Sequence, residues 1–356
     1  MGRIVVSGNN KRYLLYIAQN YSYAILRPLQ QAIQARGDEA CWFLEGCEVN
    51  PAFLRPTEKR LLTIAEVKAW KPDAVLVPGN MVPDFIPGIK VGVFHGFNSG
   101  KRNQRGHFQI RNCFDLYCTQ GPATTLPFED LADKSGTFKV AETGWPTLDP
   151  MYKGELDLAY DVEGDNRPVV LFCSTFSHRL SCAPIVYDKI KALSEQGNWR
   201  WLVQFHPKMS KEIVDKYKAL QSDNLTFVET DNVLPLLQAA DVMLCDTSSV
   251  LIMFLLQGKP VVTFKNNTSW SHLVNVEQLD EIEPALKEAL RRPPELMARI
   301  EAYCDDIHPF RDGLSSERVL AATDDLLENG TAGLKRKPLN LLRHLKMRRK
   351  LGYWRI

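Results

Sequence analysis

The stretch ADVMLCDTSSVLIMFLLQGKPVVTF, residues 240–264, decides the fold of this chain. It predicts a buried strand over 242–245, a polar turn, a helix that ends at Gly258, and a second strand after Pro260. Strand, helix and strand in this order are the repeating unit of a parallel sheet. The turn residues 246–249 then stand at the carboxyl end of a strand, where open α/β sheets bind their ligands.

The chemistry of this turn fits two interpretations. Asp and Ser at a helix start accept hydrogen bonds from free backbone N–H groups, so capping alone explains them. A helix start also carries partial positive charge and directs N–H donors outward, which favours a phosphate. Asp246, Ser248 and Ser249 are therefore candidate phosphate-binding residues, with capping as the alternative.

Length and composition limit the class of protein. A chain of 356 residues accommodates two domains, and 45% hydrophobic with 24% charged residues is typical of a soluble globular protein. The longest apolar run, 250–256, is far shorter than the roughly 20 residues of a spanning helix. The N-terminus lacks the apolar core of a signal peptide. Eight scattered cysteines without a Cys-x-x-Cys pair predict a reduced, cytoplasmic protein with no zinc site.

Strand-like and helix-like segments alternate twice along the chain. In the first half, strands are predicted at 3–7, 39–44, 73–77, 91–94, 114–118 and 138–142, and helices at 23–36 and 64–69. After an irregular stretch at 149–167, strands are predicted at 168–173, 201–205 and 225–228, and helices at 183–196, 211–221, 233–239, 281–292, 294–303 and 315–327. The pattern predicts two α/β domains, 1–150 and 168–332, joined by a linker over 151–167 and facing a cleft.

The charge is unevenly distributed. Residues 333–356 contain nine Lys or Arg and no Asp or Glu, and the whole chain has a net charge of +2. The first 332 residues therefore have a net charge of −7. A basic tail on a mildly acidic body is typical of docking on an anionic surface, although a solvated or nucleic-acid-binding tail is the alternative.

His95 follows a predicted strand in the sequence FHGFNSGKR. A histidine at the carboxyl end of a parallel strand faces the ligand crevice, and its ordinary pKa near 6.5 suits a general base. Gly96 permits close backbone approach, and Lys101 adds positive charge. A hydrogen-bonded turn histidine without a catalytic role is the alternative.

His206 stands at the corresponding place in the second half, in QFHPK. Pro207 suits the first turn of a helix and stiffens this corner. After strand 168–173 come Thr175 and Arg179, and arginine is suited to bidentate phosphate contacts. The sequence DGLSSER, which contains Asp312, Ser316 and Arg318, reads as a tight turn and a helix start. Structural roles at strand ends and helix caps remain the alternative for each.

Together, the ordered motifs HG, TGxP, STF followed by Arg, FHP, DxSS, GKP and DGxSSER resemble the CDP-glycerol glycerophosphotransferase family, which primes and polymerises teichoic acids. The resemblance runs from about His95 to Arg318 and is clearest after Pro168. It implies two Rossmann-like domains of the GT-B type, an acceptor domain followed by a nucleotide-donor domain. Beyond them, Leu341, Leu342 and Leu345 with Lys and Arg around them predict a basic helical tail over 333–356. The chain departs from the family pattern after His-Gly and after the TGxP turn, which are the acceptor side and the linker.

The resemblance also implies roles for individual residues. His95 corresponds to the proposed base on the acceptor hydroxyl, with Gly96 and Lys101 beside it. His206 corresponds to the histidine against the donor diphosphate. The remaining donor-side positions are Thr175, Arg179, Asp246, Ser248, Ser249, Asp312, Ser316 and Arg318. No metal or cofactor is implied.

The activity implied is transfer of glycerol phosphate, or a similar polyol phosphate, from a CDP-alcohol to a hydroxyl of a polymeric or lipid-linked acceptor, with release of CMP. This implies a bacterial protein of cell-wall or capsule synthesis, peripheral on the inner face of the cell membrane, with residues 333–356 against anionic lipid and no nucleic acid as partner. The alternatives are a GT-B glycosyltransferase using a nucleotide sugar, a UDP-GlcNAc 2-epimerase-like isomerase, and a non-catalytic binding relative. The isomerase ranks lower because a Ser-Gly-Gly run is absent at 246–249.

Overall fold

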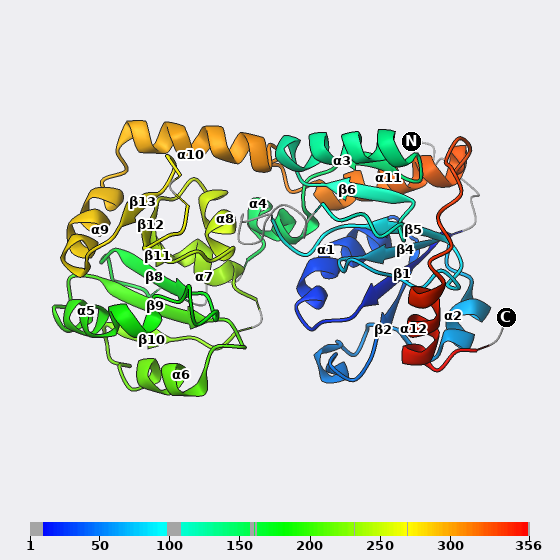
Figure 1. Cartoon of the computed structure of the whole chain (residues 1–356). Helices are drawn as coiled ribbons and strands as arrows, with labels where there is room; N and C mark the ends of the chain where they lie inside the picture. The colour runs from blue at the N-terminus through cyan, green and yellow to red at the C-terminus, as the bar shows by residue number, and fades with distance from the viewer. Residues whose placement is uncertain are drawn as a thin grey trace, which may run out of the picture. The chain divides into compact units, whose positions relative to one another are not determined.

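The computed structural model describes residues 10–97, 108–156, 160, 162–230, 232–268 and 270–354. They form two compact units, each built on its own sheet (Figure 1). Unit 1 comprises Met1–His95, Phe108–Lys153 and Phe310–Ile356, and unit 2 comprises Gly96–His107 and Gly154–Pro309. The chain therefore leaves unit 1 after Lys153 and returns to it at Phe310.

The sheet of unit 1 has seven parallel strands in the order β3-β2-β1-β4-β5-β6-β7. The strands are β1 (Arg12–Ile17), β2 (Glu39–Leu44), β3 (Arg60–Leu61), β4 (Ala74–Val77), β5 (Ile89–Gly92), β6 (Leu116–Thr119) and β7 (Lys139–Glu142). The helices are α1 (Ser22–Ala35), α2 (Ile64–Trp70), α3 (Pro122–Ser135), α4 (Asp149–Tyr152), α11 (Ser315–Asn329) and α12 (Leu341–Leu351), with 3-10 turns η1 (Pro51–Phe53) and η2 (Pro146–Leu148).

The sheet of unit 2 has six parallel strands in the order β10-β9-β8-β11-β12-β13, which is 3-2-1-4-5-6 when counted within the unit. The strands are β8 (Val169–Ser174), β9 (Arg200–Phe205), β10 (Leu225–Phe227), β11 (Val242–Cys245), β12 (Val261–Phe264) and β13 (Val274–Val276). The helices are α5 (Ala183–Glu195), α6 (Lys211–Lys218), α7 (Leu234–Ala239), α8 (Val250–Leu255), α9 (Ile282–Leu290) and α10 (Pro294–Ile307), with the 3-10 turn η3 (Leu279–Glu281).

The central strands are buried on both faces, as a helix-covered parallel sheet requires. Every residue of β4, β8 and β11 is buried. Their composition explains this, because apart from Ser174 they consist of Ala, Val, Leu, Met, Phe and Cys. Burial of such side chains removes apolar surface from water and is the main term that stabilises each unit.

The predicted fold class, two α/β domains with parallel sheets and a helical tail, is confirmed. The strand predicted at 3–7 lies outside the described residues, and β1 was not predicted. The short strands β3 and β13 were not predicted either, because runs of two or three residues carry almost no periodicity. Among the described residues, no helix is both long and apolar enough to cross a membrane.

The chain divides differently from the predicted boundaries at two places. Residues from 310 onward pack in unit 1, whereas the prediction kept residues up to 332 in the second domain. Helix α11 is held there by Asp324, which accepts the Tyr13 hydroxyl hydrogen at 2.8 Å and pairs with Lys11 at 2.8 Å. The irregular stretch 149–167 begins with α4, in which Asp149 is only 1% exposed, and unit 1 extends to Lys153 rather than ending at 150.

Candidate active site

Each unit has a point at which the strand order reverses, between β1 and β4 in unit 1 and between β8 and β11 in unit 2. In open α/β sheets the crevice for ligands lies outside the carboxyl ends of the strands at such a point. In each unit, residues predicted for the site follow strands at or beside this point.

In unit 1, His95 lies on the turn after β5, and its backbone position is unusual. Phe94 before it has φ = 60°, a left-handed conformation that is an outlier for a bulky residue. Such strained positions occur preferentially at functional sites, where surrounding contacts hold them. Here Trp145 donates its indole hydrogen to the Phe94 carbonyl oxygen at 3.4 Å, and the Phe94 ring packs edge-on against Phe128.

The hydrogen bond of the His95 ring indicates which of its two nitrogens carries the hydrogen. Nδ1 lies 3.2 Å from the carbonyl oxygen of Pro78, the residue after β4. A carbonyl oxygen only accepts, so Nδ1 carries the hydrogen and Nε2 keeps a lone pair in the neutral ring. His95 is exposed, but the protein atoms packed around one side of it lower the pKa of its ring, and the Pro78 hydrogen bond opposes this shift. The ring is therefore neutral near pH 7, as a general base must be.

Around His95, the structure describes one aromatic neighbour and one of the two residues predicted for the acceptor side. The Tyr21 ring lies 6.0 Å from the His95 ring, centre to centre. Gly96 follows His95 directly and is half-buried. Lys101 lies outside the described residues.

In unit 2, the buried carboxylate of Asp246 connects the two strands at the reversal point. It accepts hydrogen bonds from the Ser174 hydroxyl at 2.5 Å, the Thr175 N–H at 3.0 Å and the Cys182 N–H at 3.0 Å. These contacts join the end of β11 to the end of β8 and to the start of α5. Burial raises the pKa of Asp246, while these donors work in the opposite direction.

This arrangement changes the predicted roles at the turn 246–249. Asp246 holds the loop 175–182 through hydrogen bonds within the protein, rather than capping the next helix. Helix α8 begins only at Val250 and has six residues, so its dipole is weaker than the sequence suggested. Ser248 is half-buried and Ser249 exposed at its start. Thr175 is buried, and Arg179 is exposed on the loop that Asp246 holds.

His206 follows β9, next to the end of β8, and its ring is exposed. It stacks with the Phe176 ring at 4.5 Å between centres, a contact that joins the ends of two neighbouring strands. The backbone N–H of Lys208 donates to His206 Nδ1 at 3.0 Å. Nδ1 is therefore the acceptor, and in the neutral ring the hydrogen lies on Nε2.

Two asparagines at the carboxyl end of β12, in the sheet of unit 2, were not predicted as site residues. The loop after β12 contains Asn266 and Asn267, and Thr247 contacts both. The Asn267 N–H donates to the Thr247 hydroxyl at 3.3 Å, and the Asn266 N–H donates to Asn275 at 3.0 Å. The signal was present in the sequence, because KNN directly follows the buried strand VVTF.

The last predicted motif lies in unit 1. The Asp149 carboxylate accepts the backbone N–H groups of Ser315 at 2.9 Å and Ser316 at 2.8 Å, at the start of α11. Asp312 and Arg318 pair with each other, which lowers the pKa of Asp312 to about 2. These contacts describe an anchor for α11, and a role of Asp312, Ser316 and Arg318 near a nucleotide stays a prediction. Within the described ranges, no group of three or more His, Cys, Asp or Glu is gathered as a metal site requires.

Two doubly wound parallel sheets, with polar groups gathered where the strand order reverses, define an α/β protein of the GT-B type. More particularly, residues 133–272 match the family model of CDP-Glycerol:Poly(glycerophosphate) glycerophosphotransferase. This match confirms the resemblance predicted from the motifs. At the level of the family, it supports a transferase of the glycerophosphotransferase type.

Several solved structures share the fold. A structure of the wall teichoic acid polymerase TagF matches with a TM-score of 0.66 and 13% identity, over 90% of this chain and 89% of that one. The S. aureus MnaA structure with UDP matches with a TM-score of 0.61 and 15% identity, over 92% and 99%. A UDP-N-acetylglucosamine 2-epimerase matches with a TM-score of 0.59 and 15% identity, over 92% and 98%. No curated protein sequence matches the chain. At these identities, the structures establish the fold and leave the reaction to the site and the family model.

Proposed function

We propose that the protein transfers glycerol phosphate, or a similar polyol phosphate, from a CDP-alcohol to a hydroxyl of a cell-surface polymer or lipid-linked acceptor, releasing CMP. The family match over residues 133–272 supports the reaction class. The observation that carries the mechanism is the pair of strand-end histidines with opposite hydrogen-bond arrangements. One ring offers a lone pair at Nε2, and the other offers a hydrogen there.

The proposed step is a direct displacement at the β-phosphorus of the donor. The acceptor oxygen forms a bond to phosphorus, its proton moves to His95 Nε2, and the bond from phosphorus to the oxygen of CMP breaks. His206 donates its Nε2 hydrogen to a diphosphate oxygen. Arg179, Ser248 and Ser249 complete the donor side, and preorganised donors of this kind typically contribute about 3–4 kcal/mol each to a transition state.

The remaining assignments complete the proposal. Asp312, Ser316 and Arg318 approach the nucleotide, and Gly96 and Lys101 approach the acceptor. No step is assigned to a metal or a cofactor. Because a lipid-linked acceptor is held at a membrane, we place the protein at the inner face of the cell membrane, with residues 333–356 toward anionic lipid.

The test is release of CMP, UMP and UDP by purified protein from CDP-glycerol, CDP-ribitol, UDP-GlcNAc and CMP-sugars, with a crude membrane fraction as acceptor. We expect CMP only from a CDP-alcohol, and loss of release in His95→Ala and His206→Ala. His178→Ala removes an exposed histidine that the proposal does not use and is the matched control. Unchanged turnover in both variants, with unchanged melting temperatures, would overturn the transferase mechanism and favour a binding protein.

A nucleotide-sugar enzyme is the second candidate, either a glycosyltransferase or a 2-epimerase. The observation in its favour is the fold shared with the S. aureus MnaA structure and the other epimerase structure. The same panel separates the two candidates. Release of UDP, or epimerisation of UDP-GlcNAc without release, would replace the proposed function.

A further inference from the structure

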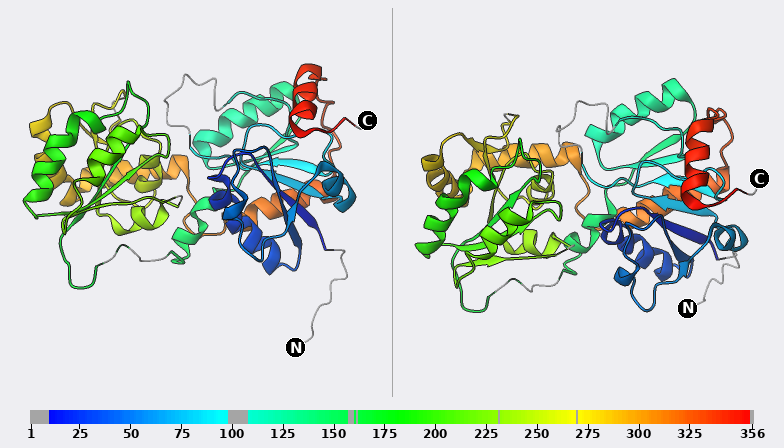
Figure 2. Two further views of the ribbon diagram at one scale, coloured as in Figure 1. Left: turned by 90° about the horizontal axis from the view of Figure 1, so that it is seen from below. Right: turned by 60° about the horizontal axis from the view of Figure 1, so that its bottom comes forward.

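The basic tail is folded against unit 1 through one face of α12, as Figures 1 and 2 show at the red end of the colour scale. Met347 on this face is 6% exposed. The Arg348 guanidinium lies 4.8 Å from the centre of the Phe85 ring, and the Tyr353 ring stacks on Phe85 at 5.2 Å. Phe85 belongs to the connection from β4 to β5, which contains no helix. Helix α12 therefore covers a part of the core that the connection leaves open.

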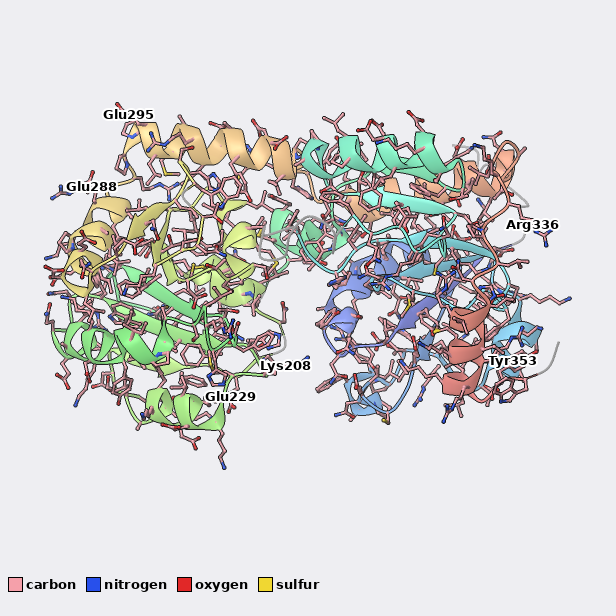
Figure 3. The ribbon with its side chains drawn as sticks, in the orientation of Figure 1. Lys208, Glu229, Glu288, Glu295, Arg336 and Tyr353 are labelled. Atoms are coloured by element: carbon pink, nitrogen blue, oxygen red, sulfur yellow. The ribbon has the colours of Figure 1, made fainter. Side chains whose placement is uncertain are left out.

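Polar contacts fix the orientation of this segment. Lys350 Nζ lies 2.6 Å from the carboxylate of the buried Glu45, and His344 Nδ1 lies 3.3 Å from Asp84. Lys337 pairs with Asp115 ahead of the helix. Figure 3 shows Tyr353 beside the end of α12, against unit 1. The tail is thus a docked helix with a defined outer face.

The first part of that outer face is apolar. Leu341, Leu342 and Leu345 are 64%, 78% and 52% exposed, and Leu339 before the helix is 68% exposed. A helix that packs on a core normally presents polar residues to water. Here the more polar residues His344 and Arg348 face the protein, and the leucines face outward. More than half of each leucine side chain is exposed, so packing on the described residues of unit 1 does not account for them.

Positive charge surrounds the leucines. Lys346 and Arg349 are exposed on α12, and Arg336 ahead of it points away from the ribbon in Figure 3. Trp354 is 59% exposed beyond the helix. Residues 333–356 contain no acidic residue. Exposed leucines, a tryptophan and flanking cations form the pattern of a helix that lies in a lipid interface.

We propose that the outer face of α12, with Leu341, Leu342 and Leu345 at its centre, docks unit 1 on an anionic lipid surface. The leucines enter the acyl boundary, while Lys346 and Arg349 contact anionic headgroups. A second copy fits less well, because two such faces would oppose like charges without an acidic partner. The choice of surface rests on the proposed function, in which the acceptor is lipid-linked. Docking through α12 would fix the orientation of the unit that carries His95.

The test is flotation of the full chain with vesicles of phosphatidylcholine alone, and of equal parts phosphatidylcholine and phosphatidylglycerol. We expect binding to the anionic vesicles, weakened by salt, and little binding to the neutral ones. The variant Leu341→Ser/Leu342→Ser/Leu345→Ser should lower partitioning roughly tenfold or more, because its apolar contribution is removed. Leu62→Ser/Leu126→Ser replaces two equally exposed leucines elsewhere in unit 1 and should change nothing.

Equal binding of the triple variant and the natural chain, or no binding of the natural chain to anionic vesicles, would overturn the proposal. Sedimentation without lipid tests for self-association. Self-association that is lost in the triple variant would overturn the proposal and assign the leucine face to a second copy of the chain. CMP release from CDP-glycerol with a soluble acceptor is measured in parallel. A triple variant that keeps this turnover but leaves the vesicles separates docking from chemistry.

Discussion

His95 in unit 1 and His206 in unit 2 both follow a parallel strand, yet their rings are held in opposite ways. His95 Nδ1 donates to the Pro78 carbonyl oxygen, whereas His206 Nδ1 accepts the Lys208 N–H. The first ring therefore keeps a lone pair on Nε2 and the second a hydrogen. Both residues are histidines, and the backbone group beside each ring decides whether its Nε2 accepts or donates a hydrogen bond. In the proposed reaction, the two histidines therefore cannot exchange roles.

Replacement of His95 should have the largest effect. The variant His95→Gln keeps a polar side chain of similar reach but has no nitrogen that can take a proton at neutral pH. We expect kcat for CMP release to fall by about 10²–10⁴, the usual contribution of a general base. The donor KM should change little, because the base acts on the acceptor. Steady-state kinetics measure both values, and a kcat within a factor of two of the natural enzyme would exclude His95 as the base.

Replacement of His206 should cost less and be partly reversible. His206→Ala removes a hydrogen-bond donor to the developing phosphate charge, which typically costs about 10²–10³ in kcat. His206→Gln should recover part of this loss, because an amide N–H replaces the Nε2 hydrogen. Glutamine should therefore rescue position 206 and fail at position 95. Equal losses for both glutamine variants would contradict the assigned difference between the two rings.

The pH dependence sharpens the comparison further. The protein atoms around His95 disfavour its charged form and lower its pKa below the ordinary value near 6.5. A base is active when neutral, so activity should persist below pH 6.5 and fall only as the pH drops through the lowered pKa. The fall below that point is about tenfold per pH unit for a single required base. A plot of kcat/KM against pH should show this acid limb, and His95→Gln should lack it.

Regular structure was largely predictable from the sequence, since strands buried on both faces read as apolar runs. Residues 242–245 were predicted as a strand and form β11, and 168–173 differs from β8 by one residue at each end. The strand β1 was not predicted, because IVVS at 4–7 carried the stronger pattern and RYLLYI begins and continues with polar or aromatic residues. Local pattern thus locates most elements and fails where two candidate runs lie close together.

The candidate site was predictable only as a set of positions. The rule that ligands meet the carboxyl ends of strands identified His95, His206 and the turn after β11. The hydrogen bonds that define their roles join residues far apart in the chain. Asp246 binds Thr175 and Cys182, which lie 71 and 64 residues away, and Asp149 binds Ser316, which lies 167 residues away. No local pattern contains such pairs, so Asp149 was read only as the start of the irregular stretch 149–167.

The smallest effects should come from these two buried carboxylates. Asp246 in unit 2 accepts a hydroxyl and two N–H groups, whereas Asp149 in unit 1 accepts two N–H groups. Asparagine keeps one acceptor oxygen but directs an NH₂ group at the remaining donors. We expect Asp246→Asn and Asp149→Asn each to lower the free energy of unfolding by about 1–3 kcal/mol, with the larger loss at Asp246. Urea denaturation near neutral pH measures both, and losses below a few tenths of a kcal/mol would show that the carboxylates do not hold their loops.

The pH dependence of the same variants provides their control. Burial raises the pKa of both carboxyl groups above their ordinary value. The folded state therefore binds these protons more tightly than the unfolded state does, and the associated stability is present at low pH and lost as the pH rises through the raised pKa. The asparagine variants lack this titration, so the free-energy difference from the natural chain should be larger at acid pH than at neutral pH. A difference that instead grows as the pH rises would mean that the hydrogen-bond donors around Asp246 and Asp149 outweigh their burial.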